Sequence, residues 1–389
     1  MNGLRKQLPE GVQDYLPGEC SEKNLIIDSF KKTFYKCGYD MVQTPVIEYL
    51  DVYTGSHFPV ENMMKIIDRN GRIAVLRPDL TLPIARMVAA SKLPLPARLC
   101  YVGEVFNMRD RKETTQVGIE LIGDSSINAD FEVVSLAISA LSDAGLKNIQ
   151  IELGQVEFFK GLMEEAGLDE DQTEELRQMT EQKNMLGVEI FLKNANVSGK
   201  IRQNLLRLSR LFGTEEVLDE AEKMSSNPRC RNAVRNLRLL WSLLADYGLK
   251  DRISVDLGIL HSIDYYTGMV FRGLAEGIGA PVLTGGRYDS LLAEFGRPSA
   301  ATGFGVDISR VMLAMESQGI LNCTTYIDSV IMYEKDSCVK AFLLADSMRE
   351  SGQRVVVAHY NTNAREYALA NGAKTLYTVS GDKVLEEVL

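Results

Sequence analysis

Residues 97–123 read ARLCYVGEVFNMRDRKETTQVGIELIG and contain the two strands that decide the fold. Alternating apolar residues and frequent β-branched residues on both sides of a polar segment are typical of two strands joined by a loop. A further strand is predicted within IAVLRPD (73–79), and helical patterns cover 21–38 and 128–145. These are too few helices between strands for a doubly wound sheet. The pattern predicts an α+β fold, with flanking helices on an antiparallel sheet.

The rest of the chain divides into three parts by its periodicity. Residues 156–250 lose strand patterns and show helical spacing throughout, which indicates a helical insertion. Strand patterns return at RISVDLGIL (252–260), so the sheet is expected to be completed afterwards within a core of 1–323. Residues 324–389 alternate strand, helix, strand, helix and strand, which predicts a small, truncated parallel α/β domain.

Composition excludes several classes of protein. The chain of 389 residues has 43 Lys and Arg against 53 Asp and Glu, a net charge of −10, whereas proteins that bind nucleic acid non-specifically are more often basic. The six cysteines are scattered and only three histidines occur, so neither a metal site nor a disulfide framework is expected. No apolar run is long enough to span a membrane, and the N-terminus lacks a secretory signal. We therefore expect a cytoplasmic protein.

Several ordered segments together resemble the class II aminoacyl-tRNA synthetases, and the histidyl-tRNA synthetase branch in particular. The pair IDYYTGMVF and GGRYD is the most specific part of the resemblance, and the whole set spans nearly the entire chain. The segments are LPEGVQDYLP (8–17), GYDMVQTPVIE (38–48), LRPDLT (76–81), PARLCYVGEVF (96–106), QVGIELIG (116–123), IDYYTGMVF (263–271), GGRYD (285–289) and GFGVDISR (303–310).

The resemblance implies a set of histidine-binding residues. A ligand ammonium buried in a pocket needs carboxylates and neutral acceptors around it. Gln116 and Glu120 are four apart on a predicted strand and so face the same side, and Glu120 is expected to meet the ammonium. Tyr265 and Tyr266 are expected to point to opposite faces, so that one of them lines the pocket. The implied set is Asp79, Thr81, Gln116, Glu120, Tyr265 and Tyr266.

Departures from the synthetase pattern bear on whether the chain can adenylate an amino acid. Adenylation brings a carboxylate against the α-phosphate of ATP, so its transition state needs fixed positive charge. Asn107 follows Phe106 where the synthetases have an arginine, and His261 aligns with a second arginine. Arg310 is kept, but Ser309 replaces a usual acidic neighbour, and the loop 107–115 is short. No catalytic residues and no cofactor are therefore expected, although Arg109 or Arg111 could substitute for the lost charge.

A synthetase-like chain with the amino-acid pocket kept and the adenylation charges removed resembles the regulatory subunits of ATP phosphoribosyltransferase, the first enzyme of histidine biosynthesis. The resemblance implies a non-catalytic homodimer, paired through residues 43–48. It further implies association with a short-form catalytic subunit, feedback through L-histidine and no tRNA. Two alternatives stay open: a genuine histidyl-tRNA synthetase, and an orphan synthetase-like module that binds another amino acid.

Residues 200–238 are locally basic within this acidic chain. They carry nine Lys and Arg residues: Lys200, Arg202, Arg207, Arg210, Lys223, Arg229, Arg231, Arg235 and Arg238. A solvated helix face is the favoured interpretation of such a charge run. The alternative is a docking surface for the catalytic subunit, centred on Arg231 and Arg235.

Overall fold

The computed structural model describes residues 6–54, 59–108, 112–197, 199–208, 210–260, 265–321, 327–359 and 363–389. The chain divides into two compact units, each described below by itself. Unit 1 comprises residues 1–13 and 25–321, and unit 2 comprises residues 14–24 and 322–389. Among the described residues, no helix combines the length and the apolar character needed to cross a bilayer.

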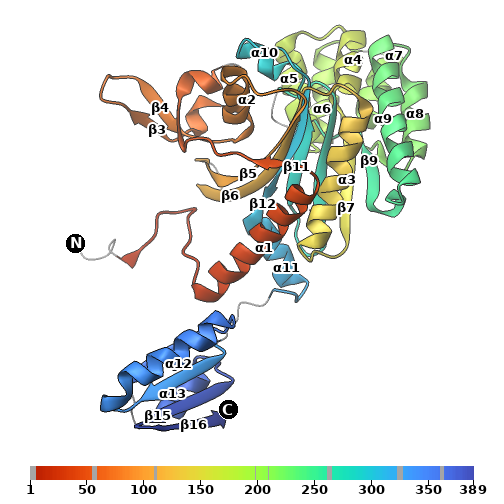
Figure 1. Cartoon of the computed structure of the whole chain (residues 1–389). Coiled ribbons are helices and arrows are strands. Elements are labelled where there is room, and N and C mark those ends of the chain that lie inside the picture. Colours follow the sequence, from red (N-terminus) through yellow and green to blue (C-terminus); the bar gives the residue numbers. More distant parts are fainter. Residues whose placement is uncertain are drawn as a thin grey trace. The chain divides into compact units, whose positions relative to one another are not determined.

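Unit 1 is built on a mixed sheet whose strands run in the order β1-β5-β6-β12-β11-β10-β7-β9-β8 (Figure 1). The five central pairings, from β5 through to β7, are all antiparallel, as the sequence predicts. Parallel pairing occurs between β1 and β5 and between β7 and β9. The strands are β1 (Asp40–Met41), β5 (Ala97–Phe106), β6 (Glu113–Ile122), β7 (Ile149–Gln155), β8 (Phe212–Gly213), β9 (Ile253–Asp256), β10 (Met269–Ala275), β11 (Leu283–Arg287) and β12 (Ala301–Asp307).

Glycines allow two central strands to lie close together under polar side chains. β6 pairs with β12 so that Glu120 lies opposite Gly303 and Gly118 lies opposite Gly305. A Cβ atom added at Gly303 would overlap Oε2 of Glu120, so the absence of a side chain there makes room for the carboxylate. The middle of the sheet can therefore hold long polar side chains on a floor that is mostly backbone.

Helices pack against the sheet of unit 1 (Figure 1). α3 buries Val133, Val134, Ala137 and Leu141, a helical repeat that faces the sheet. α1 begins at Pro17, one turn before the helical pattern predicted for 21–38. The remaining helices of the core are α2, α10 and α11. The bounds are α1 (Pro17–Lys36), α2 (Thr81–Ala90), α3 (Ile127–Asp143), α10 (Leu291–Glu294) and α11 (Ile308–Ser317).

The segment 38–48, which resembles a synthetase motif, does not form one continuous strand. β1 ends at Met41, and β2 (Ile47–Tyr49) joins a separate small sheet with β4 (Ile73–Leu76) and β3 (Lys65–Ile67). Between them the buried Arg77 donates to the carbonyl oxygens of Thr44 at 2.7 Å and Pro45 at 3.2 Å. The carbonyl oxygens of Thr44 and Pro45 therefore accept hydrogen bonds from a side chain and not from a neighbouring strand. This explains why the strand is interrupted between β1 and β2.

The insertion is helical, as predicted, except for the two-residue strand β8, which pairs with β9 at the edge of the central sheet. Local signals set its helix ends. Asp169 and Gln172 form a reciprocal capping box at the start of α5. Pro228 occupies the first turn of α9, and the side chain of Asn227 accepts from the backbone N–H of Arg229. The helices are α4 (Val156–Ala166), α5 (Glu170–Glu181), α6 (Met185–Asn194), α7 (Gly199–Leu208), α8 (Glu216–Met224) and α9 (Pro228–Asp246).

Unit 2 contains a four-stranded sheet in the order β14-β13-β15-β16. The strands β13, β14 and β15 are parallel, as the strand–helix alternation predicts. The prediction that the domain stops after a third strand is wrong, because β16 pairs antiparallel with β15 along the edge. Every residue of β16 is exposed, which removes the apolar signature of a buried strand. The elements are β13 (Ser329–Tyr333), α12 (Cys338–Glu350), β14 (Val355–His359), α13 (Ala364–Ala370), β15 (Thr375–Ser380) and β16 (Lys383–Val388).

Candidate functional site

All six residues implied by the resemblance line one small cavity on the central strands, which we call the inner pocket. Its volume is about 50 Å³. β5, β6, β11 and β12 supply the floor, and the segments before β10, after β11 and at the start of α2 supply the walls. The inner pocket is lined by Asp79, Thr81, Tyr101, Gln116, Glu120, Tyr265, Tyr266, Thr284, Tyr288, Gly303, Phe304 and Gly305.

Glu120 is the buried acid of the inner pocket, with only 1% of its surface exposed. Thr81 Oγ1 donates to its Oε1 at 2.8 Å, and the hydroxyl of Tyr288 donates to its Oε2. Burial raises the pKa of Glu120 to about 8, against the lowering effect of the Tyr288 and Thr81 hydrogen bonds. Glu120 is therefore mostly neutral at pH 7, and a donor or cation beside it would favour its ionised form.

Gln116 lies at the other end of the pocket, four residues back along β6, and is half-buried. Its Oε1 is buried without a hydrogen-bond partner among the described residues, which leaves an acceptor directed at the pocket. Asp79 accepts through Oδ1 from the backbone N–H of Leu82 at 2.8 Å, which fixes it at the start of α2. The pocket thus has an acidic inner end and a neutral acceptor at its mouth.

The prediction that Tyr265 and Tyr266 face opposite sides is wrong. Both are buried and both line the inner pocket, with ring centroids 4.9 Å apart. They precede β10, which begins at Met269, so the two-residue alternation of a strand does not apply to them. The pair forms one aromatic wall, and Tyr265 also contacts Tyr288 edge to face at 5.6 Å.

The remaining pocket residues were missed in the sequence. Tyr288 lies within GGRYD, a segment singled out only for its resemblance, and Tyr101 lies on β5 opposite Gly118. Gly303 and Gly305 are two apart within β12, and this spacing places two positions without side chains on one face of a strand. Such a glycine alternation was a usable signal for the pocket floor.

A larger cavity of about 310 Å³, which we call the outer cleft, continues from the mouth of the inner pocket. The two share Gln116, Thr284 and Gly305. Of the described residues that line the outer cleft, Arg310 is the one cation. Its Nη1 donates to the carbonyl of Pro281 at 2.8 Å, and its Nε lies 3.3 Å from Oδ2 of Asp307. Two of its nitrogens are thus already engaged by the protein.

Of the positions that depart from the synthetase pattern, some lie within the described residues and some do not. Asn107 lines the outer cleft. His261 and the candidate substitutes Arg109 and Arg111 lie outside the described residues. Among the described residues, no group of three or more His, Cys, Asp and Glu side chains is arranged to hold a metal ion.

Comparisons with known proteins give one consistent result. The family model described as histidyl-tRNA synthetase matches residues 11–311. The ATP phosphoribosyltransferase regulatory subunit of Acetivibrio thermocellus is 42% identical, over 97% of this chain and 93% of that protein. The regulatory subunit of Ruminiclostridium cellulolyticum is 39% identical over the same shares. A solved structure from Bacillus halodurans, described as an ATP phosphoribosyltransferase regulatory subunit/histidyl-tRNA synthetase, superposes with a TM-score of 0.88 at 32% identity, covering 98% of this chain and all of that one.

Proposed function

This chain belongs to the family of ATP phosphoribosyltransferase regulatory subunits, and we propose from this premise that it reports the histidine level to a catalytic subunit in the cytoplasm. The catalytic partner is a short-form ATP phosphoribosyltransferase. The observation that carries the proposal is the pairing of a complete inner pocket with an outer cleft whose one described cation already has protein partners. Such a site can bind an amino acid without activating it.

We place the imidazole of histidine at Glu120 and its ammonium near the mouth of the pocket. Glu120 is enclosed by tyrosines, which suits a flat heteroaromatic ring with N–H groups. Gln116 offers its unpartnered Oε1 to the ammonium, and Asp79 also lines the inner pocket. Four residues along a strand span roughly 13 Å, enough for one histidine between the two side chains. This orientation differs from the ammonium role that the sequence suggested for Glu120.

Histidine entry requires the inner pocket to widen. Its 50 Å³ is far below the roughly 300 Å³ of ordinary ligand pockets, whereas the adjoining outer cleft has about 310 Å³. The ligand carboxylate would then point toward the outer cleft, the direction in which a synthetase holds ATP. A narrow and a widened form of the inner pocket would give histidine two states to distinguish, which feedback regulation requires.

The test is reconstitution with a short-form catalytic subunit that lacks its own regulatory domain. We expect the catalytic subunit to co-purify with this chain, to gain activity from it, and to lose that activity as histidine is added. Glu120→Gln should preserve association and activation but shift histidine inhibition to higher concentration. Absence of a stable complex would contradict the regulatory role, and unchanged histidine inhibition would contradict the pocket.

We further propose a homodimer formed through the small sheet, near the predicted segment 43–48. Exposed apolar side chains gather on this sheet and beside it, which is unusual for a free surface. They are Val46, Ile47, Tyr49, Ile66, Ile67 and Ile73. Light scattering at micromolar concentration should give twice the chain mass of 43.3 kDa, and Ile47→Glu should shift the mass toward the monomer.

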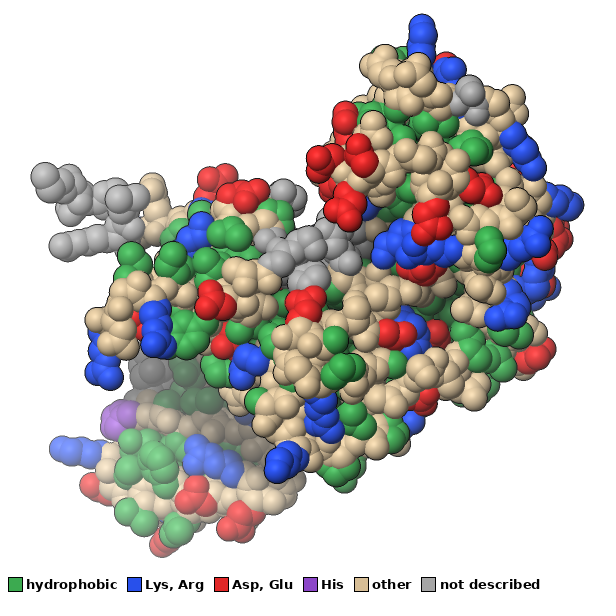
Figure 2. Space-filling model, turned by 90° about the horizontal axis from the view of Figure 1, so that it is seen from above, with side chains coloured by type: hydrophobic (Ala, Val, Ile, Leu, Met, Phe, Trp, Pro, Cys, Tyr) green, Lys and Arg blue, Asp and Glu red, His purple; other side chains and the backbone are tan. Residues whose placement is uncertain are grey.

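The basic stretch 200–238 is largely neutralised within the insertion. Arg202, Arg207, Arg229 and Arg238 each form an ion pair with a nearby acid. Figure 2 shows basic and acidic side chains interspersed on the side where Figure 1 places the insertion.

Arg231 and Arg235 are exposed on α9 with no ion pair among the described residues, and we propose them as a contact for the catalytic subunit. Arg231→Glu with Arg235→Glu should weaken the complex in a salt-dependent way; unchanged association would favour a solvated helix face.

A further inference from the structure

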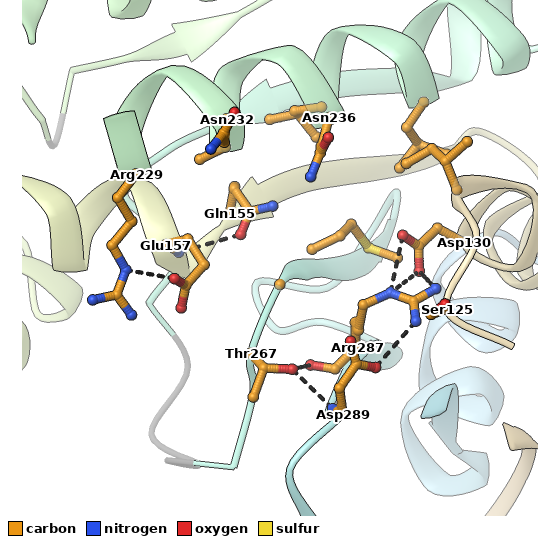
Figure 3. A pocket seen from close by; sticks show the side chains of 16 residues that line it. Ser125, Asp130, Gln155, Glu157, Arg229, Asn232, Asn236, Thr267, Arg287 and Asp289 are labelled. Atoms are coloured by element: carbon orange, nitrogen blue, oxygen red, sulfur yellow. Dashed lines mark hydrogen bonds and ion pairs between the residues drawn. The ribbon is translucent and has the colours of Figure 1, made fainter. Parts of the chain in front are cut away.

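A second cavity of about 360 Å³ lies between α9 and the ends of β7, β10 and β11, and we call it the α9 cavity (Figure 3). It shares no lining residue with the inner pocket. Thr267 and Asp289 line it, while their chain neighbours Tyr266 and Tyr288 line the inner pocket. Its volume falls within the range of about 300–1,000 Å³ that is common for small-molecule sites.

The charged groups of the α9 cavity are already matched to one another. The guanidinium of Arg287 donates to Asp130 at 3.0 Å, to Asp289 at 3.1 Å, and to two backbone carbonyls. Arg229 pairs with Glu157 and with Glu164, which lies just outside the cavity. The lining therefore has three carboxylates against two guanidinium groups, and an anionic ligand would enter against a negative excess.

Neutral hydrogen-bonding groups, by contrast, are left unused. Gln155 is buried and accepts through Oε1 from the backbone N–H of Glu157 at 3.2 Å, while its Nε2 has no hydrogen bond to a described residue. Asn232 and Asn236, one turn apart on α9, direct their carboxamides into the cavity and are equally without side-chain hydrogen bonds within the described ranges (Figure 3). Asp289 uses Oδ1 for Arg287 and for the N–H of Ala301, which leaves Oδ2 available.

We propose that the α9 cavity binds an uncharged purine nucleoside. A carboxamide presents a donor beside an acceptor, the pattern that pairs with the edge of adenine. A free carboxylate oxygen accepts from ribose hydroxyls, which is the role Asp289 would take. The apolar side chains of Leu237, Leu240 and Met269 supply surface for the face of the base.

Charge decides between the nucleoside and its phosphates. A 5′-phosphate would bring two negative charges to a lining whose arginines already face carboxylates. We therefore expect adenosine to bind more tightly than AMP. Ribose alone should bind much more weakly than adenosine, because it offers nothing to the carboxamides of Asn232 and Asn236.

The experiment is titration of adenosine, AMP and ribose into the full chain, followed by ligand-observed NMR and calorimetry. Adenosine should saturate at roughly millimolar concentration or below. The double variant Asn232→Leu, Asn236→Leu should weaken adenosine binding by about tenfold or more, because two hydrogen-bonding groups are lost. The matched control is Arg231→Leu, Arg235→Leu on the same helix, outside the cavity lining, which should bind adenosine like the wild type.

Both asparagines are exposed, so thermal melts should show the double variant to be folded. Histidine titrated into the same variant gives a second readout of an intact core, independent of the α9 cavity. Absence of saturable adenosine binding to the wild type would overturn the proposal. Equal weakening by the control, tighter binding of AMP, or ribose binding as tight as that of adenosine would each overturn it as well.

Discussion

The inner pocket and the outer cleft lie end to end on the same strands, share Gln116, Thr284 and Gly305, and yet differ in chemistry. The inner pocket is enclosed, with a buried acid and four tyrosines: Tyr101, Tyr265, Tyr266 and Tyr288. The outer cleft is wider and is lined by one described cation, Arg310, already held by Asp307 and Pro281.

Under the function proposed above, this difference separates recognition of the amino acid from its activation within one fold. The groups of the inner pocket come mostly from paired strands and their immediate ends, which the sheet fixes. The resemblance implies that the positive charge needed for adenylation would come from the positions of Asn107, which directly follows the end of β5, and His261. Loops tolerate replacement better than central strands do. A family can therefore lose the reaction and keep the amino acid as a signal.

The strongest challenge to this comparison is an assay for adenylation. With positive charge replaced at two positions, each worth about 100-fold, histidine-dependent ATP–pyrophosphate exchange should fall at least ~10⁴-fold below that of a histidyl-tRNA synthetase. We expect the purified chain to be at background, with an active synthetase measured alongside as the control. Exchange that rises with histidine would show that the outer cleft still activates amino acids.

The contribution of the inner pocket is tested by Glu120→Gln, which removes the charge but keeps the volume. A hydrogen bond to a charged group is worth roughly 1.5–3 kcal/mol, so histidine binding should weaken about ten- to a hundred-fold by calorimetry. Glu113→Gln, on the exposed end of the same strand, is the matched control and should bind normally.

The same pair of variants separates the two orientations of histidine. If Glu120 holds the ring, then imidazole alone should also bind more weakly to Glu120→Gln. Equal binding of imidazole to the wild type and to the variant would instead indicate that Glu120 binds the ammonium group of histidine.

A smaller effect is expected in thermal stability without ligand. The pKa of Glu120 is raised to about 8 in the folded protein, so between pH 4.5 and 8 the folded chain keeps a proton that the unfolded chain releases. Stability associated with this group is present at low pH and is lost as the pH rises through about 8. Glu120→Gln should therefore raise Tm relative to the wild type by roughly 3–6 °C more at pH 8 than at pH 5. A Tm difference that does not change with pH would instead place the Glu120 carboxylate in contact with water.

The sequence predicted the central sheet, the helical insertion, and a pocket formed by Asp79, Thr81, Gln116, Glu120 and one of the two adjacent tyrosines. Their assignment as histidine ligands stays a prediction. Gly303 lies opposite Glu120 through a pairing of strands distant in sequence, which local periodicity does not encode. Tyr265 and Tyr266 precede β10, which begins at Met269, so strand alternation does not predict which way they face. β16 was missed because its exposed residues carry no apolar signal.

The end of β11 distributes successive side chains between two cavities. Arg287 and Asp289 line the α9 cavity, and Tyr288 between them donates to Glu120 in the inner pocket. Deletion of a single residue within 283–289 would bring each side chain to the wrong face of the sheet, disrupting the Arg287–Asp130 ion pair and the Glu120 hydrogen bond together. In a library of single-residue deletions, this short stretch should therefore be among the least tolerant, whereas substitutions there should damage one cavity at a time.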